Sequence, residues 1–534
     1  MSTTGAAAVG AASGIATAGA ASLRPSLTPR STLHQALVTG MMATTGAVAG
    51  AAVGALVRRG PLGERVGPLL GTAVVVGSAS LALVRSRRNL HAHAEAHTEW
   101  GDSSGSPVLG AGAGVAAAAG LTLAATVTSR GINRVADRLS ERFGGPRVLW
   151  SAAESAVLAG TTIVAGRALA RRTKAHLIAE GKAADSALTA APSNPYVSGG
   201  DESLVRYDTL SREGRRFVHW RVSRKELEEY GAETVQEPLR IFVGIDSEAT
   251  LSARVDLAMA ELERLGAFDR KHLLAICPAG SGYANSVPVE ALEIYSAGDC
   301  ASVVLQYGVL PSMFSVDRIP DAADGYRLLL DRIRVRIEES PRRPQLHLYG
   351  ESLGAHIAQV ALTRTPNLVD EEEAAVMGID SALFVGSPGG TELRDQLADN
   401  PHVVHVDRWE ELPAQPPADC QLWFLDHDAD PVTRFERQLI RSQPHWLSRA
   451  PRGRNVPPDM SWVPIWTWQQ VLLDVAYATQ SQSGVFRSLG HDYRADLAPL
   501  VAAAYCPERQ SSAARVQQIL AEREIARDQL LSQS

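Results

Sequence analysis

The sequence has little lysine and little excess charge of either sign. Its 52 basic residues are almost all arginine, and the lysines are Lys174, Lys182, Lys225 and Lys271. The net charge of −6 and the pI near 6.2 describe a mildly acidic chain. Such a chain gives no reason to expect a nucleic-acid partner, because that partner requires a concentrated positive surface.

Cysteine is also scarce, and no two of the four form a C-x-x-C pair. They are Cys277, Cys300, Cys420 and Cys506. Their spacing argues against a zinc knuckle or a thioredoxin-like motif and leaves disulfide pairing open. The G-K-[ST] sequence of a Walker phosphate-binding loop is missing as well. We therefore expect neither a metal site nor a cofactor.

The composition changes near residue 190, which predicts two parts of different chemistry. Alanine, glycine, valine, threonine and serine dominate upstream, whereas short apolar runs alternate with amphipathic segments downstream. A Pro/Gly/Ser-rich segment separates the two parts and is typical of a linker. We predict a membrane domain over 1–190, a linker over 191–204, a catalytic α/β domain over 205–505 and an amphipathic helix over 506–534.

The upstream part contains uncharged runs of about the length that crosses a bilayer as a helix. They are 37–57, 66–84 and 107–129, and a fourth run, 148–166, carries one acid, Glu154. Arginines bracket these runs. We therefore predict an all-α domain of about four transmembrane helices in the cell membrane. The distribution of arginine weakly favours a cytoplasmic catalytic domain. The alternative is an alanine-rich soluble bundle, because alanine and glycine add little insertion energy.

Two patterns in the upstream part have functional and structural interpretations. Gly46, Gly50 and Gly54 share a helix face, a spacing that lets helices pack closely in lipid, or they reflect composition alone. His93 and His97 lie four residues apart in HAHAEAH, but no Glu follows His93 directly as the zinc-protease motif requires. We expect an exposed loop there.

The downstream alternation predicts a mostly parallel sheet with helices on both faces. Apolar runs typical of strands occupy 239–246, 272–278, 302–308, 345–350, 382–388 and 421–427. Helical periodicity occupies 255–266, 321–340 and 353–362, with a further helix expected around 466–479. In such sheets, sites form where loops leave the carboxyl ends of the strands.

The pentapeptide GESLG, residues 350–354, lies between a predicted strand and a predicted helix. A nucleophile on a sharp strand-to-helix turn needs small residues two positions before and after it, and Gly350 and Gly354 occupy them. The turn exposes the hydroxyl of Ser352 and places the N–H of Leu353 at a helix N-terminus. Ser352 is therefore the predicted nucleophile, the alternative being a Gly-rich turn without chemistry.

A second oxyanion donor is expected from the loop CPAGSGY, residues 277–283. Its glycines permit close approach of a substrate to the backbone. The backbone N–H of Gly280 or Ser281 is the candidate. An ordinary turn is the alternative.

The serine needs a base, and the base needs an acid, in the chain order Ser, Asp or Glu, then His. Asp430 in DADPV follows the last predicted strand, with Asp426 and Asp428 as rivals. His491 in LGHDYRAD lies downstream in a loop, with His427 and His445 as alternatives. We predict Asp430 and His491.

These motifs resemble those of the bacterial membrane-associated α/β-hydrolase family, which joins an N-terminal multi-span domain to a C-terminal catalytic domain. The resemblance rests on RIFVGIDS, LERLGAFDR, CPAGSGY, SAGDCASVVLQYGVLPS, GESLG, DADPV and GHDY. Family members often carry Thr-Gly-Thr-Gly-Trp where this chain has Ala-Gly-Ser-Gly-Tyr at 279–283. The resemblance implies an α/β-hydrolase fold and a serine hydrolase, but no particular substrate.

The sequence thus predicts a membrane-anchored serine esterase or lipase-like enzyme with the triad Ser352, Asp430 and His491. Its expected partners are the lipid bilayer and an acyl ester, of which a lipid is one candidate. The oligomeric state stays open. An acyltransferase with the same triad and a non-catalytic membrane scaffold are the alternatives. The tryptophans of SWVPIWTW, residues 461–468, fit either an aromatic wall near the substrate or core packing.

Overall fold

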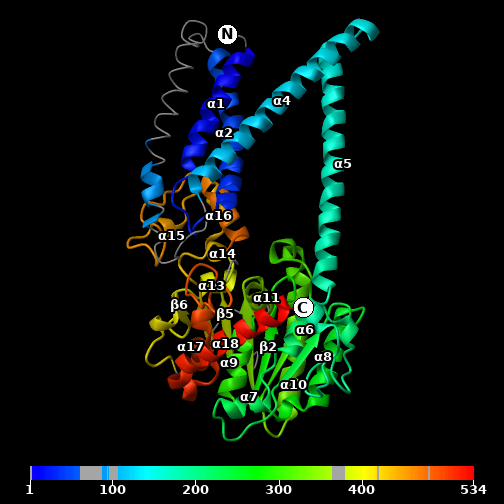
Figure 1. The fold of residues 1–534 in the computed structure, drawn as a ribbon, viewed down its shortest axis with the longest axis vertical. Coiled ribbons are helices and arrows are strands. Elements are labelled where there is room, and N and C mark those ends of the chain that lie inside the picture. Colours follow the sequence, from blue (N-terminus) through cyan, green and yellow to red (C-terminus); the bar gives the residue numbers. More distant parts are fainter. Residues whose placement is uncertain are drawn as a thin grey trace. The chain divides into compact units, whose positions relative to one another are not determined.

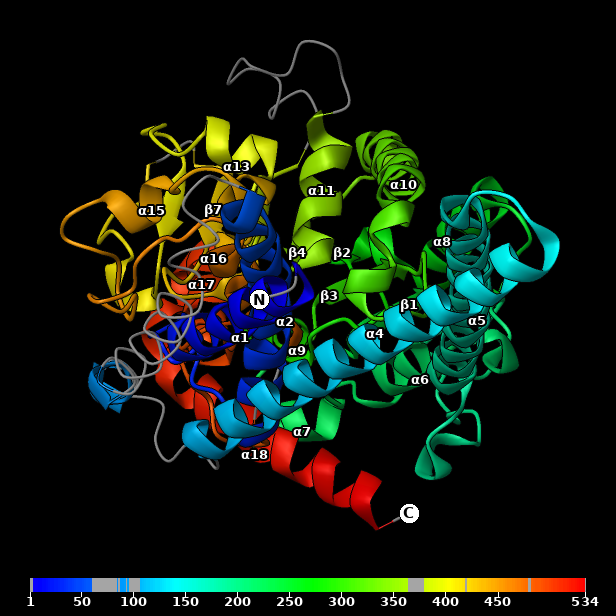
Figure 2. The same cartoon turned by 90° about the horizontal axis from the view of Figure 1, so that it is seen from above.

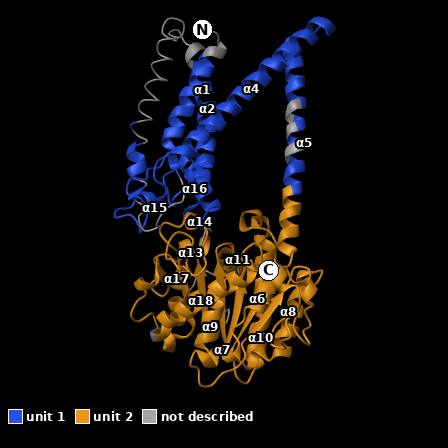
Figure 3. Cartoon of the chain, viewed as in Figure 1, with its two compact units in different colours: residues 1–172, 434–478 blue, residues 173–433, 479–534 orange. Residues whose placement is uncertain are grey.

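The computed structural model describes residues 3–59, 84, 87–92, 94–95, 106–363, 379–417, 420–478 and 482–533. The chain forms two compact units (Figure 3). Unit 1 consists of residues 1–172 together with 434–478, and unit 2 consists of 173–433 together with 479–534. The predicted span 66–84 falls almost entirely outside the described residues, as do His93 and His97 of HAHAEAH.

Unit 1 is helical. Its main helices are α1 (Thr3–Ala21), α2 (Thr32–Arg59), α4 (Pro107–Phe143), most of α5 (Arg147–Lys182), α15 (His445–Ser448) and α16 (Trp466–Ala476). The glycine face of α2 packs on α1 through the backbone. A Cβ added at Gly50 would lie 2.1 Å from the carbonyl oxygen of Gly10, and one at Gly46 would lie 2.4 Å from that of Gly14. The predicted close packing therefore exists, because only glycine lets these two backbones approach so closely.

Two helices among the described residues are long and apolar enough to cross a bilayer. They are Thr32–Leu56 and Pro107–Phe143. Large apolar side chains on α4 and α5 are exposed, including Leu121, Leu123, Val157 and Val164. The helix α5 contains the predicted run 148–166, and several side chains of that run lie outside the described residues.

Segment 434–478 is inserted in the chain between Asp430 and His491, and it packs with the N-terminal helices. Asp474 of α16 accepts from Arg30 Nε at 3.3 Å and from the hydroxyl of Ser26, and both Asp474 and Arg30 are fully buried. Trp466 packs on Ala18, Val38 and Met42. The sequence-based division assigns this segment to the catalytic domain, because nothing local in it reveals partners more than 400 residues away. Trp466 therefore contributes to core packing.

Unit 2 is built on a seven-stranded parallel sheet in the order β1-β3-β2-β4-β5-β7-β6. The strands are β1 (Leu239–Val243), β2 (His272–Cys277), β3 (Cys300–Leu305), β4 (Gln345–Glu351), β5 (Ser381–Val385), β6 (Val404–Val406) and β7 (Leu422–Leu425). Almost every strand residue is buried, which explains the continuous apolar runs in the sequence. The predicted parallel sheet is confirmed, and only β6, at the edge, lacks a sequence prediction.

Helices cover both faces of the sheet (Figures 1 and 2). One face carries α8 (Leu251–Leu265), α10 (Ile319–Glu339) and α11 (Leu353–Thr363). The other carries α6 (Arg212–His219), α9 (Ser286–Tyr295) and α17 (Arg494–Tyr505). Shorter helices are α7 (Arg224–Glu229), α13 (Glu392–Gln396) and α14 (Pro431–Arg434). Both faces are thus shielded from water, as a parallel sheet requires.

The two segments flanking the catalytic domain in the sequence-based division both pack on unit 2. Val197, within the predicted linker, is buried and bridges to Arg240 of β1. The C-terminal helix α18 (Ala513–Ser532) buries Val516 and Leu520, and its Arg523 forms an ion pair with Glu290 of α9 at 2.7 Å. The apolar stripe on α18 therefore docks on its own domain.

Candidate active site

Ser352 lies on a strained turn between β4 and α11. Its φ of +55° falls in the left-handed region that non-glycine residues rarely adopt. Both predicted glycines are sterically required. A Cβ at Gly354 would lie 2.1 Å from the carbonyl oxygen of Cys277, and one at Gly350 would lie 2.7 Å from that of Gly354. The turn therefore has the geometry of a nucleophile elbow.

The turn is fixed to both neighbouring strands. The N–H of Ser352 donates to the carbonyl of Val385 at the end of β5, at 2.8 Å. On the other side, Gly354 packs against Cys277 at the end of β2. Ser352 thus lies at the carboxyl edge of the sheet, where the β2 loop also begins.

Two backbone groups of the predicted oxyanion loop differ in their hydrogen bonding. The N–H of Gly280 donates to Ser312 Oγ at 3.3 Å. The N–H of Ser281 has no hydrogen-bond partner among the described residues. Leu353 is the first residue of α11, so its N–H has no partner within the helix. Leu353 and Ser281 are therefore better suited than Gly280 to donate to a substrate oxygen.

His491 and Asp430 are brought together across 61 residues. His491 Nδ1 lies 2.7 Å from Asp430 Oδ2, and the two side chains are 5% and 0% exposed. Asp430 Oδ1 accepts from the N–H of Val432 at 2.8 Å. Burial alone lowers the pKa of His491, but the charge and hydrogen bond of Asp430, together with the charges of Glu351 and Asp492, outweigh burial and raise it. The imidazole is thus oriented through its Nδ1 by a buried carboxylate.

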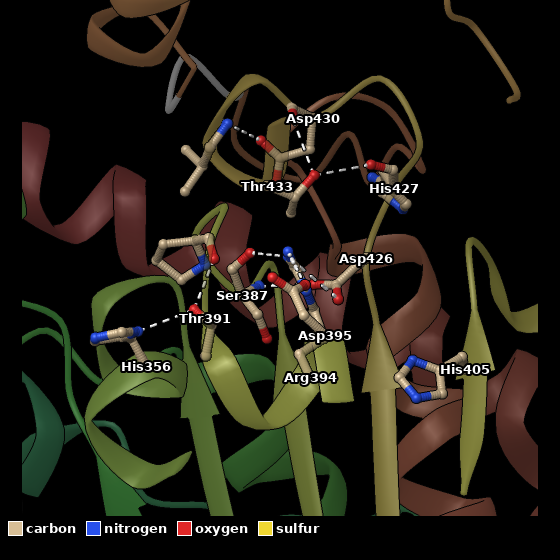
Figure 4. Close-up of polar contacts among 12 residues, drawn as sticks. His356, Ser387, Thr391, Arg394, Asp395, His405, Asp426, His427, Asp430 and Thr433 are labelled. Atoms are coloured by element: carbon tan, nitrogen blue, oxygen red, sulfur yellow. Dashed lines mark hydrogen bonds and ion pairs between the residues drawn. The ribbon is translucent and has the colours of Figure 1, made fainter. Parts of the chain in front are cut away.

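The rival acids have other partners. Asp426 Oδ1 accepts from the N–H of Ser387 at 2.6 Å (Figure 4). The N–H of Asp428 donates to Asp407 Oδ1 at 2.5 Å. Each of these contacts fixes a loop at the carboxyl edge of the sheet.

The other histidines considered as bases have different contacts or positions. His427 Nε2 lies 3.0 Å from Asp496 Oδ2, and both side chains are buried. His347 lies inside β4, 3.0 Å from His272 Nδ1, in a buried pair whose pKa values burial lowers. His445 begins α15 in unit 1.

Sequence reasoning missed Tyr493, which contacts the predicted acid directly. Its hydroxyl donates to Asp430 Oδ2 at 2.6 Å. It also missed Glu351, next to the predicted nucleophile, whose Oε2 accepts from Tyr349 at 2.6 Å and from Asn285 at 2.8 Å. The only signal for Tyr493 is its place two residues after His491, which does not reveal a contact with a residue 63 positions away.

The described residues contain no group of three or more His, Cys, Asp and Glu side chains that could hold a metal ion. A serine hydroxyl at a helix N-terminus can attack a carbonyl carbon when a base takes its proton.

Comparison with known proteins gives two family matches. A family model described as "Alpha/beta-hydrolase family" matches residues 239–519, and one described as "Alpha/beta-hydrolase family N-terminus" matches residues 23–220. No curated protein and no solved structure matches the chain. The first match alone covers more than half of the sequence and contains Ser352, Asp430 and His491. The chain therefore belongs to the alpha/beta-hydrolase family.

Proposed function

We propose that this protein is a membrane-anchored serine hydrolase that cleaves an acyl ester. The observation that carries the proposal is the buried contact of 2.7 Å between His491 Nδ1 and Asp430 Oδ2, together with the strained backbone of Ser352. Strain of this kind persists only where the surrounding structure maintains it, and it concentrates at functional sites.

In the proposed reaction, Ser352 Oγ attacks the carbonyl carbon of the ester. His491 Nε2 takes the hydroxyl proton and returns it to the leaving alcohol, while Asp430 stabilises the imidazolium that forms. Water then attacks the acyl-enzyme, with His491 acting as base again. The N–H groups of Leu353 and Ser281 stabilise the oxyanion, and each such donor contributes roughly 100- to 1,000-fold to the rate.

An apolar acyl group is the substrate class that the loop beside the oxyanion donors favours. Met313, Phe314 and Val316 are 53%, 51% and 53% exposed. This loop is tied to the oxyanion loop, since Ser312 accepts from Gly280 N–H and Ser315 Oγ contacts the carbonyl of Gly280 at 3.5 Å. Exposed apolar side chains beside the proposed oxyanion loop suit a lipid-like ester better than a polar one.

Membrane anchoring is part of the proposal. The helices Thr32–Leu56 and Pro107–Phe143 supply two apolar spans, and the exposed apolar side chains of α4 and α5 suit contact with lipid. We propose a multi-pass anchor of about four spans with the catalytic domain on the cytoplasmic side. Such an anchor would keep the active site at a surface where lipid esters are abundant.

The test uses a fluorophosphonate probe on membranes containing the wild type, Ser352→Ala, His491→Ala or the control Ser340→Ala. Ser340 is a buried serine at the end of α10 that donates to Phe268. We expect labelling of the wild type and of Ser340→Ala only, because loss of a triad member costs about 10⁴-fold or more. Labelling that persists in Ser352→Ala would refute the elbow as the nucleophile.

The same membranes distinguish the two alternatives. With long-chain and short-chain p-nitrophenyl esters, we expect the higher kcat/KM for the long chain. Product formed only when an alcohol acceptor is added would indicate an acyltransferase with this triad. A folded wild type that neither labels nor turns over esters would support a non-catalytic scaffold.

A further inference from the structure

Tyr493 connects the two residues on which the proposed proton transfer depends. Its hydroxyl donates to Asp430 Oδ2 at 2.6 Å, and the same oxygen accepts from His491 Nδ1 at 2.7 Å. The phenol is 1% exposed. Burial and the neighbouring carboxylate of Asp430 raise the pKa of Tyr493 well above its usual range, so the hydroxyl keeps its proton and remains a donor.

The ring of Tyr493 is packed between two imidazoles. It stacks on His427 at 4.0 Å between ring centroids and meets His491 edge-on at 5.6 Å. Both Tyr493 and His491 press on the backbone of Gly386, where an added Cβ would lie 2.8 Å from Tyr493 Cε2 and 2.9 Å from His491 Cε1. Gly386 directly follows Val385, which accepts from the N–H of Ser352. The histidine is therefore held against the strand end that also holds the nucleophile.

His427 and Asp496 hold the other side of the same loop. His427 Nδ1 donates to the carbonyl of Gly490 at 2.8 Å, immediately before His491, and Nε2 lies 3.0 Å from Asp496. The backbone N–H of His427 donates to the hydroxyl oxygen of Tyr493 at 3.1 Å. The hydroxyl of Tyr493 is thus fixed as an acceptor from His427 and as a donor to Asp430.

We propose that Tyr493, supported by His427 and Asp496, is a positioning residue that sets the orientation and the basicity of His491 through Asp430. This inference rests on the proposed function only for its importance to catalysis. The hydroxyl of Tyr493 shares the oxygen of Asp430 that pairs with His491, and so it draws negative charge away from that pair.

The sign of the effect follows from this sharing. A carboxylate that loses a hydrogen-bond donor keeps more of its charge for the remaining partner. In Tyr493→Phe the ring and its packing persist, but Asp430 interacts more strongly with the imidazolium form of His491. We expect the titration midpoint of His491 to rise by about 0.5 to 1 pH unit.

The experiment measures that midpoint directly by NMR in the full-length protein in detergent, labelled with ¹³C at the histidine ring. The signal of His491 is assigned by its loss in His491→Gln. The matched control is Tyr505→Phe. Tyr505 is also buried, and its hydroxyl donates to the carbonyl of Leu348 at 2.8 Å rather than to a residue of the proposed triad. We expect an upward shift in Tyr493→Phe and no shift in Tyr505→Phe.

The possible outcomes separate the inference from the proposed function. An unchanged midpoint in Tyr493→Phe, or an equal shift in both variants, overturns the role of Tyr493. The midpoint is measured without any substrate, so it stands whether or not Ser352 reacts with the fluorophosphonate. If the probe does label the wild type, the labelling rate is also measured as a function of pH. The midpoint of its acid limb must then move to higher pH in Tyr493→Phe by the same amount as the NMR midpoint of His491.

Discussion

At the scale of single residues, the raised pKa of His491 sets the pH at which the proposed base works. A general base must be neutral to accept a proton, so kcat/KM rises with pH through the pKa of the free enzyme. Asp430 raises that pKa against the effect of burial. We therefore expect the acid limb of the kcat/KM profile for a soluble ester to have its midpoint above about 6.5, the ordinary value for histidine.

The same shift fixes the sign of the effect on stability. Because the folded-state pKa of His491 is raised, its ion pair with Asp430 stabilises the folded protein fully below the ordinary pKa. That contribution is lost as pH rises through the folded-state value. If the acid limb of the kcat/KM profile had its midpoint well below about 6.5, burial would dominate over Asp430 in setting the pKa of His491.

Candidate site residues could be predicted where a short sequence motif contains them, and not where they depend on contacts with distant residues. GESLG between a strand and a helix predicts Ser352 as the nucleophile from five residues, and the position of DADPV after a strand predicts Asp430 as the acid. Tyr493 gives no such signal, because its role depends on a hydrogen bond to a residue 63 positions earlier. The different hydrogen bonding of Gly280 and Ser281 was equally unpredictable, since it depends on where Ser312 lies in three dimensions.

At the scale of elements, the packing of α16 on the N-terminal helices depends on one buried charge. Asp474 neutralises Arg30, and the charge of Arg30 helps to hold the pKa of Asp474 at about 2 against burial. In Asp474→Asn the guanidinium of Arg30 stays buried without its counter-charge, which costs about 3–5 kcal/mol. We expect hydrogen exchange of the α16 amides to accelerate roughly 100-fold or more, measured by mass spectrometry on the full chain.

The control for this variant is Asp137→Asn, because Asp137 pairs with Arg147 at 2.6 Å on the surface of the same unit. Both side chains of that pair are about half exposed, so we expect no measurable change in exchange. Unchanged protection of α16 in Asp474→Asn would mean that apolar contacts, such as those of Trp466, suffice to hold the helix.

Elements with a clear apolar run or helical periodicity in the sequence were predictable. Elements that depend on contacts with distant parts of the chain were not. The apolar runs of β1 to β5 and of β7 are continuous because both faces of the sheet are covered. The edge strand β6 is three residues long, too short for any period to show. Segment 191–204 has the composition of a linker, yet Val197 is buried because β1 offers it a free edge.

At the scale of the whole molecule, the apolar helices predict behaviour in membranes. Under the proposed membrane anchoring, the helices Thr32–Leu56 and Pro107–Phe143 would bury apolar surface in lipid, and alkali does not extract such helices. We expect the chain to stay in the membrane pellet after extraction with alkaline carbonate and to enter the supernatant with detergent. A peripheral protein of the same membranes serves as the control and is released by carbonate. Recovery of the chain in the carbonate supernatant would support a soluble alanine-rich bundle.

The insertion of 434–478 into the helical unit also affects the order in which the molecule is completed during synthesis. Arg30 and Asp474 are 444 residues apart in the chain. At about 5–20 residues per second, a ribosome needs roughly 20 to 90 seconds to pass from one to the other. Until then, the N-terminal helices lack the carboxylate that neutralises Arg30, so Arg30 must remain hydrated. The N-terminal helices are thus synthesised well before segment 434–478, and they reach their final packing only after that segment has been made.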